Sequence, residues 1–342
     1  MVRVHPGAHF LFMKNKDTEH EYIVDKNDHD KRLDMFLVEK IGVSRAQVQK
    51  YIHAGTVTVN AKPPRKPGDM IKVGSTVIWT ERATEIHSAL LDKKKTVIDV
   101  DTYGIKIVAD TPEYVVINKP AGLLVHETNA HETDTVVRWL LAHYPQIAGV
   151  GEDIVRPGIV HRLDREASGL MVVAKTQKMF DHLKKQFQDR TIDKEYAVLG
   201  HEVVAKDHDV IDFDIDHGVD GRMVARPKID MMKVKNVTKA QPGKVAKTEF
   251  FVVKRFTRFT LLSVKIHTGR THQIRVHLFA YNHPVVGDTI YMNPKLNRKR
   301  DQALGRLFLH AEKLGFTTLS DERVCFEASL PKELKNFLKE LK

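Results

Sequence analysis

The feature that most constrains the fold is a series of short apolar runs that starts near residue 96. These runs have the length and the β-branched and aromatic content of strands. Clear examples are "YVVINK", "GLMVVA", "EYAVLG", "KTEFFVV" and "FTLLSVKI". Helical stretches interrupt them at 134–144, 177–188 and 272–282, without a regular strand–helix–strand order. The sequence therefore predicts an α+β domain over residues 96–342 and not a regular βαβ array.

A smaller unit is predicted over residues 20–80. Its stretch "DKRLDMFLVEKIG" has a helical period, with Asp30 as the N-cap and Gly42 as the end of the helix. A second helix follows, and Ser44 and Gln47 have the spacing of a capping box at its start. The runs "TVTVNA" and "IKVGSTVIWT" then predict two strands.

The charge balance favours a polyanionic partner. The chain has 55 Lys and Arg against 44 Asp and Glu, a formal net charge of +11, which favours nucleic acid ahead of an acidic membrane surface. The single cysteine, Cys325, excludes an intrachain disulfide and a thiolate zinc cluster. No run is long enough to span a bilayer, and the N-terminus makes a poor signal peptide. We therefore expect a cytoplasmic protein.

The smaller unit is similar to a known RNA-binding domain. The matching positions are Arg32-Leu33-Asp34, Ser44-Arg45, Ile52, Gly55 and Val57-Thr58-Val59-Asn60. Together they resemble the S-four-type RNA-binding domain, although Ala61 stands where that type usually has a glycine. The resemblance implies a small α/β domain in which Arg32 and Arg45 contact RNA. Residues 1–19 are expected to form a tail, and residues 81–95 a linker.

Four separated motifs in the larger unit are candidates for chemistry. They are "NKPAGLLVH", "GIVHRLDREASGLMVVAK", "DKEYAVL" and "TGRTHQIRVHL". In the second motif, Asp164 lies between Arg162 and Arg165 and precedes Gly169 and an apolar run. This arrangement suits either a surface ion pair at a strand entrance or a carboxylate kept ionised by neighbouring positive charge.

Single residues in these motifs allow other interpretations. A metal site would draw on His161, Asp164, His272 and His277. The last two histidines are a poor fit to one helix face, and the neighbouring arginines disfavour a cation. A glycosidase-like site would need a second constrained acid beside Asp164. Arg270 and Arg275 could be phosphate clamps, and Tyr196 could be a core tyrosine with its hydroxyl at the rim.

Taken together, the four motifs and "RLFLHAEKLGF" near the end resemble the RluA-type RNA pseudouridine synthases. The resemblance implies a mixed, mostly antiparallel sheet flanked by helices and loops. It also implies isomerisation of uridine to pseudouridine, which needs no cofactor or metal because no group is donated and no net redox change occurs. Asp164 would be the nucleophile and Arg275 its ion-pair partner, and Tyr196 would pack against the target base and help to remove the C5 proton.

The same resemblance implies residues that bind the RNA substrate. Arg162 would fill the position of the flipped base or steady that base, because its planar guanidinium can stack on nucleobases. The remaining expected substrate-binding residues are His161, Lys194, Arg270, Arg32 and Arg45. The charged segment 207–247 leaves the choice of substrate open, and Ala167 replaces a threonine common in this family.

We expect the partner to be large-subunit ribosomal RNA ahead of tRNA, because RNA-binding extensions of this type accompany the rRNA-modifying members. A non-catalytic RNA-binding or ribosome-assembly factor on the same scaffold is one alternative, and a metal- or carboxylate-dependent hydrolase is another. The joint presence of Asp164, Tyr196 and Arg275 favours the enzyme. A monomer is the default expectation.

Overall fold

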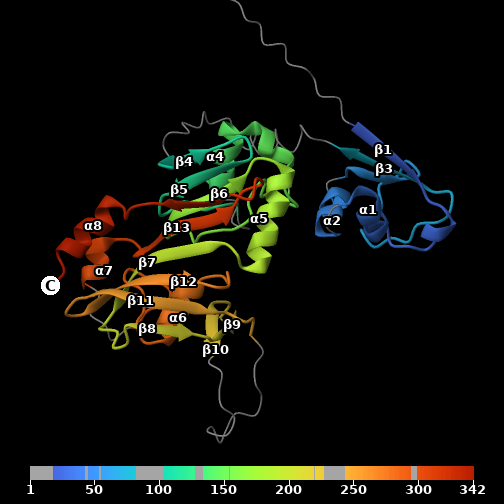
Figure 1. Ribbon diagram of the computed structural model, residues 1–342. Helices are drawn as coiled ribbons and strands as arrows, with labels where there is room; N and C mark the ends of the chain where they lie inside the picture. Colours follow the sequence, from blue (N-terminus) through green and yellow to red (C-terminus); the bar gives the residue numbers. More distant parts are fainter. Residues whose placement is uncertain are drawn as a thin grey trace, which may run out of the picture. The chain divides into compact units, whose positions relative to one another are not determined.

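The computed structural model describes residues 18–42, 45–53, 55–81, 103–127, 134–153, 155–218, 220–226, 243–293 and 299–342 (Figure 1). The chain divides into two compact units. The smaller comprises Met1–Val97 with Glu152–Ile154, and the larger comprises Ile98–Gly151 with Val155–Lys342. The expected linker 81–95 lies outside the described residues except for Glu81, which ends a strand, and most of the expected tail lies outside them as well.

The smaller unit packs two helices on a three-stranded antiparallel sheet of order β1-β3-β2. Its elements are β1 (Thr18–Ile23), η1 (Lys26–Asp28), α1 (Leu33–Ile41), α2 (Arg45–His53), β2 (Val57–Val59) and β3 (Thr76–Glu81). Leu33, Phe36 and Leu37 are buried, as the helical period predicts, and they pack in one core with Trp79. The strand expected from residue 71 begins only at Thr76.

The expected start of α1 was wrong. Its N-cap is Arg32, whereas Asp30 adopts a left-handed backbone with φ of 55°. The amides of Leu33 and Asp34 donate to the backbone carbonyls of Asp69 and Pro67, respectively. Backbone carbonyls of a loop that is distant in sequence therefore take the place of a capping side chain. The helix ends at Gly42 in the left-handed conformation, as expected. The Ser44–Gln47 capping box involves positions outside the described residues and side chains.

The larger unit is built on one nine-stranded sheet. Its main path has the order β4-β5-β6-β13-β7-β12-β11-β8, and β14 pairs with β13. The strands are β4 (Lys106–Asp110), β5 (Tyr114–Lys119), β6 (Ser168–Ala174), β7 (Asp193–His201), β8 (His208–Ile211), β11 (Thr248–Arg255), β12 (Phe259–Ile266), β13 (Leu309–Thr317) and β14 (Arg323–Glu327). Only β6 and β13 pair in parallel among the described strands, which confirms the mixed, mostly antiparallel α+β fold.

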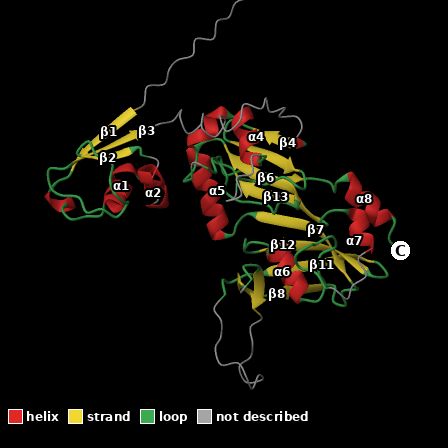
Figure 2. Ribbon diagram, turned by 180° about the vertical axis from the view of Figure 1, so that it is seen from behind, coloured by secondary structure: helices red, strands yellow, loops and turns green. Residues whose placement is uncertain are grey.

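Helices flank this sheet (Figures 1 and 2). They are α4 (Val136–His143), η3 (Pro145–Gly149), α5 (Gln177–Asp189), α6 (Gln273–Ala280), α7 (Lys299–Leu304) and α8 (Lys332–Lys339). Helix α5 packs on β6 and β13, and α6 packs on β11 and on a separate hairpin of β9 (Asp214–His217) and β10 (Met223–Arg226). The five strands and three helices expected from the apolar runs are confirmed. None of the helices in the described part of the chain has the length and apolarity to cross a bilayer.

Gly169 allows the close approach of β6 and β13. Its φ is 122°, and a Cβ atom built there would lie 2.3 Å from the backbone oxygen of Ala311. Any side chain would therefore separate the two strands. Strand β6 is buried along its whole length, and the loop that leads into it carries Asp164.

Candidate active site

A cleft of about 910 Å³ in the larger unit brings the expected residues of that unit together. Its lining includes His161, Arg162, Asp164, Lys194, Tyr196, Arg270, His272 and Arg275. These residues come from the loop before β6, from β7 and from the start of α6. Three motifs that are far apart in the sequence therefore meet in one cavity.

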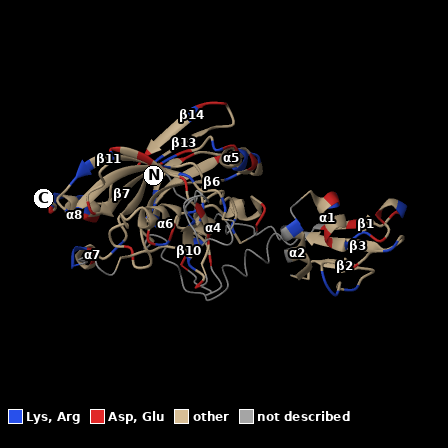
Figure 3. Cartoon of the chain, turned by 90° about the horizontal axis from the view of Figure 1, so that it is seen from below, with Lys and Arg blue, Asp and Glu red and all other residues tan. Residues whose placement is uncertain are grey.

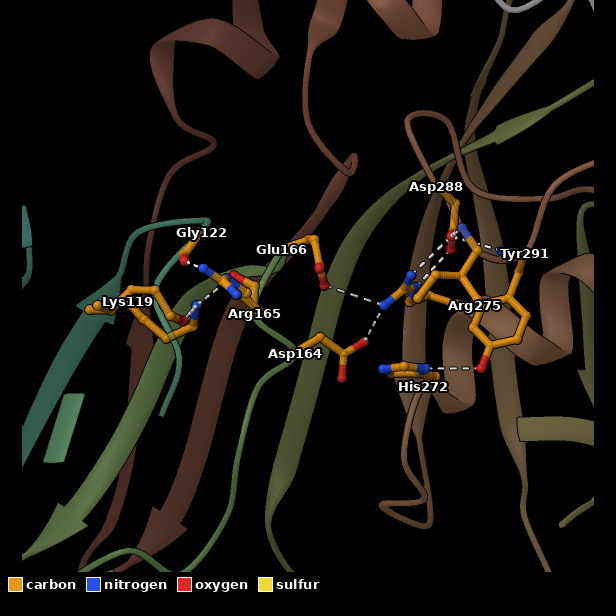
Figure 4. Close-up of polar contacts among 11 residues, drawn as sticks. Lys119, Gly122, Asp164, Arg165, Glu166, His272, Arg275, Asp288 and Tyr291 are labelled. Carbon is orange, nitrogen blue, oxygen red and sulfur yellow. Dashed lines mark hydrogen bonds and ion pairs between the residues drawn. The ribbon is translucent and has the colours of Figure 1, made fainter. Parts of the chain in front are cut away.

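The loop that carries Asp164 is held by a buried lysine at the end of β5. Lys119 donates from Nζ to the backbone oxygens of Pro120 and Leu123, at 2.8 Å each, and to that of Arg165 at 3.2 Å (Figure 4). Burial lowers the pKa of Lys119 to about 7, although the negative charge of Asp164 acts in the opposite direction. The three carbonyls match the three donors of an ammonium group.

Arg165 strengthens the same connection. The Gly122 amide donates to the Arg165 backbone oxygen at 2.7 Å, and Nε of Arg165 donates back to the Gly122 oxygen at 3.1 Å. The first motif, through Lys119 and Gly122, therefore supports the loop of the second motif; this support is called the loop brace below. The Arg165 side chain points toward Gly122 (Figure 4).

Arg275 is the electrostatic centre of the site. Its side chain is 1% exposed, and it donates to the fully buried Asp288 through Nε at 2.7 Å and Nη2 at 2.9 Å. Its third nitrogen, Nη1, lies 3.3 Å from Asp164 Oδ2 and 3.5 Å from Glu166 Oε2 (Figure 4). Burial alone would lower the pKa of Arg275, but its hydrogen-bonded pair with Asp288 raises it above the ordinary value. Asp164 therefore shares a permanently charged guanidinium with two other carboxylates.

Tyr196 is buried on β7 and lines the same cleft. Burial raises the pKa of its phenol, and the negative charge of Asp164 raises it further. The phenol is therefore protonated at neutral pH and cannot serve there as a ready base. The core interpretation and the catalytic interpretation of this tyrosine are compatible, since it is both buried and in the cleft.

His161 and Lys194 share one aromatic neighbour. The ring of His161 stacks on Phe187 with centroids 4.9 Å apart, and Lys194 Nζ lies 5.1 Å from the centroid of the Phe187 ring. His161 Nε2 accepts from the amide of Val172 at 3.0 Å. Burial, with a smaller contribution from Lys194, lowers the pKa of His161 to about 3, and burial lowers that of Lys194 to about 8.

Two further arginines that the sequence predicts for the site, Arg162 and Arg270, differ in how they are held in the cleft. Arg162 is exposed, and no hydrogen bond or ion pair holds its guanidinium within the described part of the chain. Arg270 donates from Nε to the backbone oxygen of Val245 at 3.1 Å, and its amide donates to Gln273 Oε1. Arg162 is thus free to follow a substrate, whereas Arg270 is fixed.

Arg32 and Arg45 belong to the smaller unit, where one buried carboxylate orients both. Asp34 accepts from Arg32 at 2.9 and 3.0 Å, from Arg45 at 3.0 Å and from Gln49 at 2.9 Å. Hydrogen bonds from Arg32 keep the pKa of Asp34 well below its ordinary value against the opposing effect of burial. The arginine side chains remain 45% and 51% exposed, so they present fixed positive charge at the surface.

Sequence reasoning missed Lys119, Asp288 and Tyr291 as parts of this site. Lys119 is part of the first motif, "NKPAGLLVH", and Asp288 lies in the stretch "HPVVGDTIY", which follows the fourth motif; that position was the one available signal. Tyr291 has its ring under the Arg275 guanidinium, at 5.3 Å, and its backbone amide on Asp288 Oδ1 at 2.9 Å. Nothing in the local sequence pattern distinguishes it from an ordinary core tyrosine.

The comparisons with known proteins match both units. Residues 113–280 match the family model described as RNA pseudouridylate synthase, and residues 31–77 match the S4 domain model. The uncharacterized RNA pseudouridine synthase YlyB of Bacillus subtilis is 33% identical over 318 residues, which cover 91% of this chain and 94% of that protein. A ribosomal large subunit pseudouridine synthase D of Neisseria meningitidis serogroup B is 34% identical over 91% of this chain and 79% of its own length.

A solved structure shows the same similarity. The human RNA pseudouridylate synthase domain containing 4 is 25% identical, with a TM-score of 0.56 over 76% of this chain and 98% of that chain. The human RNA pseudouridylate synthase domain containing 1, at 24% identity and a TM-score of 0.51, supports the fold.

Proposed function

Since the chain belongs to the RluA-type RNA pseudouridine synthases, an isomerase family, we propose that Asp164 is its catalytic nucleophile. The observation that carries this proposal is the contact of Asp164 with buried Arg275 at 3.3 Å inside a cleft that also holds Tyr196. The guanidinium at that distance orients the Asp164 carboxylate in the cleft, where a carboxylate can attack an electrophilic carbon.

The isomerisation breaks the bond between ribose and N1 of uracil and forms a bond from ribose to C5. Asp164 would assist the first step. Tyr196, protonated and buried in the same cleft, would pack against the uracil ring. C5 loses a proton and N1 gains one, so the isomerisation involves no net proton transfer. Arg275 would hold the Asp164 carboxylate in place, because Asp288 already holds the guanidinium rigid.

RNA binding would use the cations around this centre. Arg162, exposed and unrestrained, is suited to stack where the target base leaves its helix. Lys194, Arg270 and His161 would contact the target strand from the walls of the cleft. Arg32 and Arg45, held on Asp34, would bind phosphates through the smaller unit. Lys and Arg are also present on α5 and α7 (Figure 3).

We propose large-subunit ribosomal RNA as the substrate. The S4 domain and the similarity to proteins named for the large ribosomal subunit support it over tRNA. A non-catalytic assembly factor is disfavoured because such a factor would not need a braced loop and a buried Arg275–Asp288 pair around Asp164.

The test is tritium release from RNA labelled at uracil C5, taken from cells that lack this protein and separated into rRNA and tRNA. Wild type should release tritium from rRNA, and Asp164→Asn should reduce the release to background. Asp321→Asn, an exposed turn residue outside the cleft, is the matched control and should behave as wild type. Release by Asp164→Asn at the wild-type rate would refute the nucleophile, and release from tRNA alone would refute the substrate.

A further inference from the structure

His272 occupies a strained position at the start of α6 that the proposed roles do not explain. Its backbone is left-handed, with φ of 55°, and its side chain makes no capping hydrogen bond to the helix. Such a conformation is costly for a residue with a Cβ, and it is retained where the surroundings fix it. The side chain lines the cleft beside Asp164 (Figure 4).

One nitrogen of the His272 ring is already engaged. Nδ1 lies 2.9 Å from the hydroxyl of Tyr291, and the two rings meet edge to face. Figure 4 shows the other ring nitrogen, Nε2, turned toward the Asp164 carboxylate. Burial lowers the pKa of His272, so the ring is neutral and carries a single proton at neutral pH.

Two neighbours determine which nitrogen carries that proton. Burial raises the pKa of the Tyr291 phenol, so the phenol keeps its proton and can donate it to His272 Nδ1. The Asp164 carboxylate faces Nε2 and can only accept, so it favours the imidazole proton on that nitrogen. The single proton of the imidazole then lies on Nε2 and points into the cleft.

On the basis of the proposed function, we propose that His272 Nε2–H donates a hydrogen bond to a carbonyl oxygen of the target uracil while the base is detached from the ribose. The C1′–N1 bond breaks with its electron pair on N1, and the negative charge spreads to the carbonyl oxygens. His272 keeps its proton throughout and stabilises that charge as a fixed donor. Tyr291, through its hydroxyl at His272 Nδ1, would fix the orientation of this donor.

Thio-substituted substrates test the hydrogen bond directly, since sulfur accepts weakly. Oligonucleotides would carry the target uridine as uridine, 2-thiouridine or 4-thiouridine, and single-turnover rates would be measured. Loss of one donor to a developing oxyanion costs about 10²-fold in rate, so His272→Phe and His272→Asn should slow by about that factor on uridine while KM for RNA stays within about 3-fold. Asn tolerates the left-handed backbone and guards against misfolding.

The decisive result is coupling between enzyme and substrate changes. One of the two thio substitutions should slow wild type but leave His272→Asn no slower than it is on uridine. Equal slowing of both enzymes by both thio substrates, with normal wild-type turnover of uridine, would overturn the inference while leaving the proposed function intact.

Two further measurements complete the test. His143→Phe, which removes an exposed histidine of α4 outside the cleft, should match wild type. In 15N-labelled protein the His272 proton should be found on Nε2. In Tyr291→Phe, a measurable fraction of the molecules should carry this proton on Nδ1 instead. A proton on Nδ1 in wild type would overturn the inference.

Discussion

Neutralising Asp288 should weaken both the fold and the site. Asp288→Asn keeps the size of the side chain and an oxygen for the amides of Ile290 and Tyr291, which donate to Oδ1 at 2.8 and 2.9 Å. It removes the charge that balances Arg275, with both partners fully or almost fully buried. At an effective dielectric of about 20, two charges about 4 Å apart attract by about 4 kcal/mol. Breaking a buried pair by removing one partner costs about 3–5 kcal/mol. We therefore expect the free energy of unfolding of the larger unit to be lower by about that amount in Asp288→Asn at pH 7.5.

The catalytic rate should fall as well. Without Asp288, the guanidinium of Arg275 has only Asp164 and Glu166 as charged partners, at 3.3 and 3.5 Å. We expect it to turn onto Asp164 and bind that carboxylate more tightly. An ion pair stronger by about 1.4 kcal/mol would already reduce the reactivity of the carboxylate about 10-fold.

The chain offers a clean assay for the larger unit. It has two tryptophans, Trp79 in the smaller unit and Trp139 in the larger one. In a Trp79→Phe background, fluorescence during urea unfolding reports the larger unit alone, which avoids mixing two transitions. Glu166→Gln is the matched control, because Glu166 is 42% exposed and should contribute less than about 1 kcal/mol. A loss for Asp288→Asn no larger than for Glu166→Gln would refute the reasoning.

Three other predictions concern charge, turn geometry and the loop brace. Because the pKa of His161 is lowered to about 3, the unfolded chain binds a proton there between about pH 6.5 and pH 3 that the folded chain does not. Stability of the larger unit should therefore fall as pH falls through that window, and His161→Gln should flatten this dependence in urea titrations; an unchanged profile would contradict it. Ala61 and Asn60 form a two-residue turn with φ of 60° and 50°, so Ala61→Gly should stabilise the smaller unit by up to about 1 kcal/mol, measured by Trp79 fluorescence. Lys119→Met removes three hydrogen bonds to backbone carbonyls and should cost about 2–4 kcal/mol in the Trp139 assay, whereas wild-type stability would show that the brace contributes nothing.

The parts of the fold that follow from local pattern were predictable. The apolar run at 169–174 is β6, buried throughout, and the helical period at 33–41 is α1. The start of α1 was not predictable, because backbone carbonyls of Pro67 and Asp69 satisfy its first amides in place of a side chain near Asp30. A local pattern does not show a contact that the chain makes only after it has folded back.

The same limit separates Asp164 from Asp288. The motif around Asp164 is enough to single it out in the sequence, but its distance from Arg275 is a product of folding across 111 residues. Asp288 belongs to none of the four motifs, yet it makes the two shortest side-chain contacts to Arg275. With Asp164 as the proposed nucleophile, the difference in distance to Arg275 matters. A carboxylate that accepted the two short hydrogen bonds from Arg275 would have its negative charge too strongly stabilised to attack. Asp288 takes those bonds, and Asp164 is left with one longer contact and a side chain 15% open to the cleft.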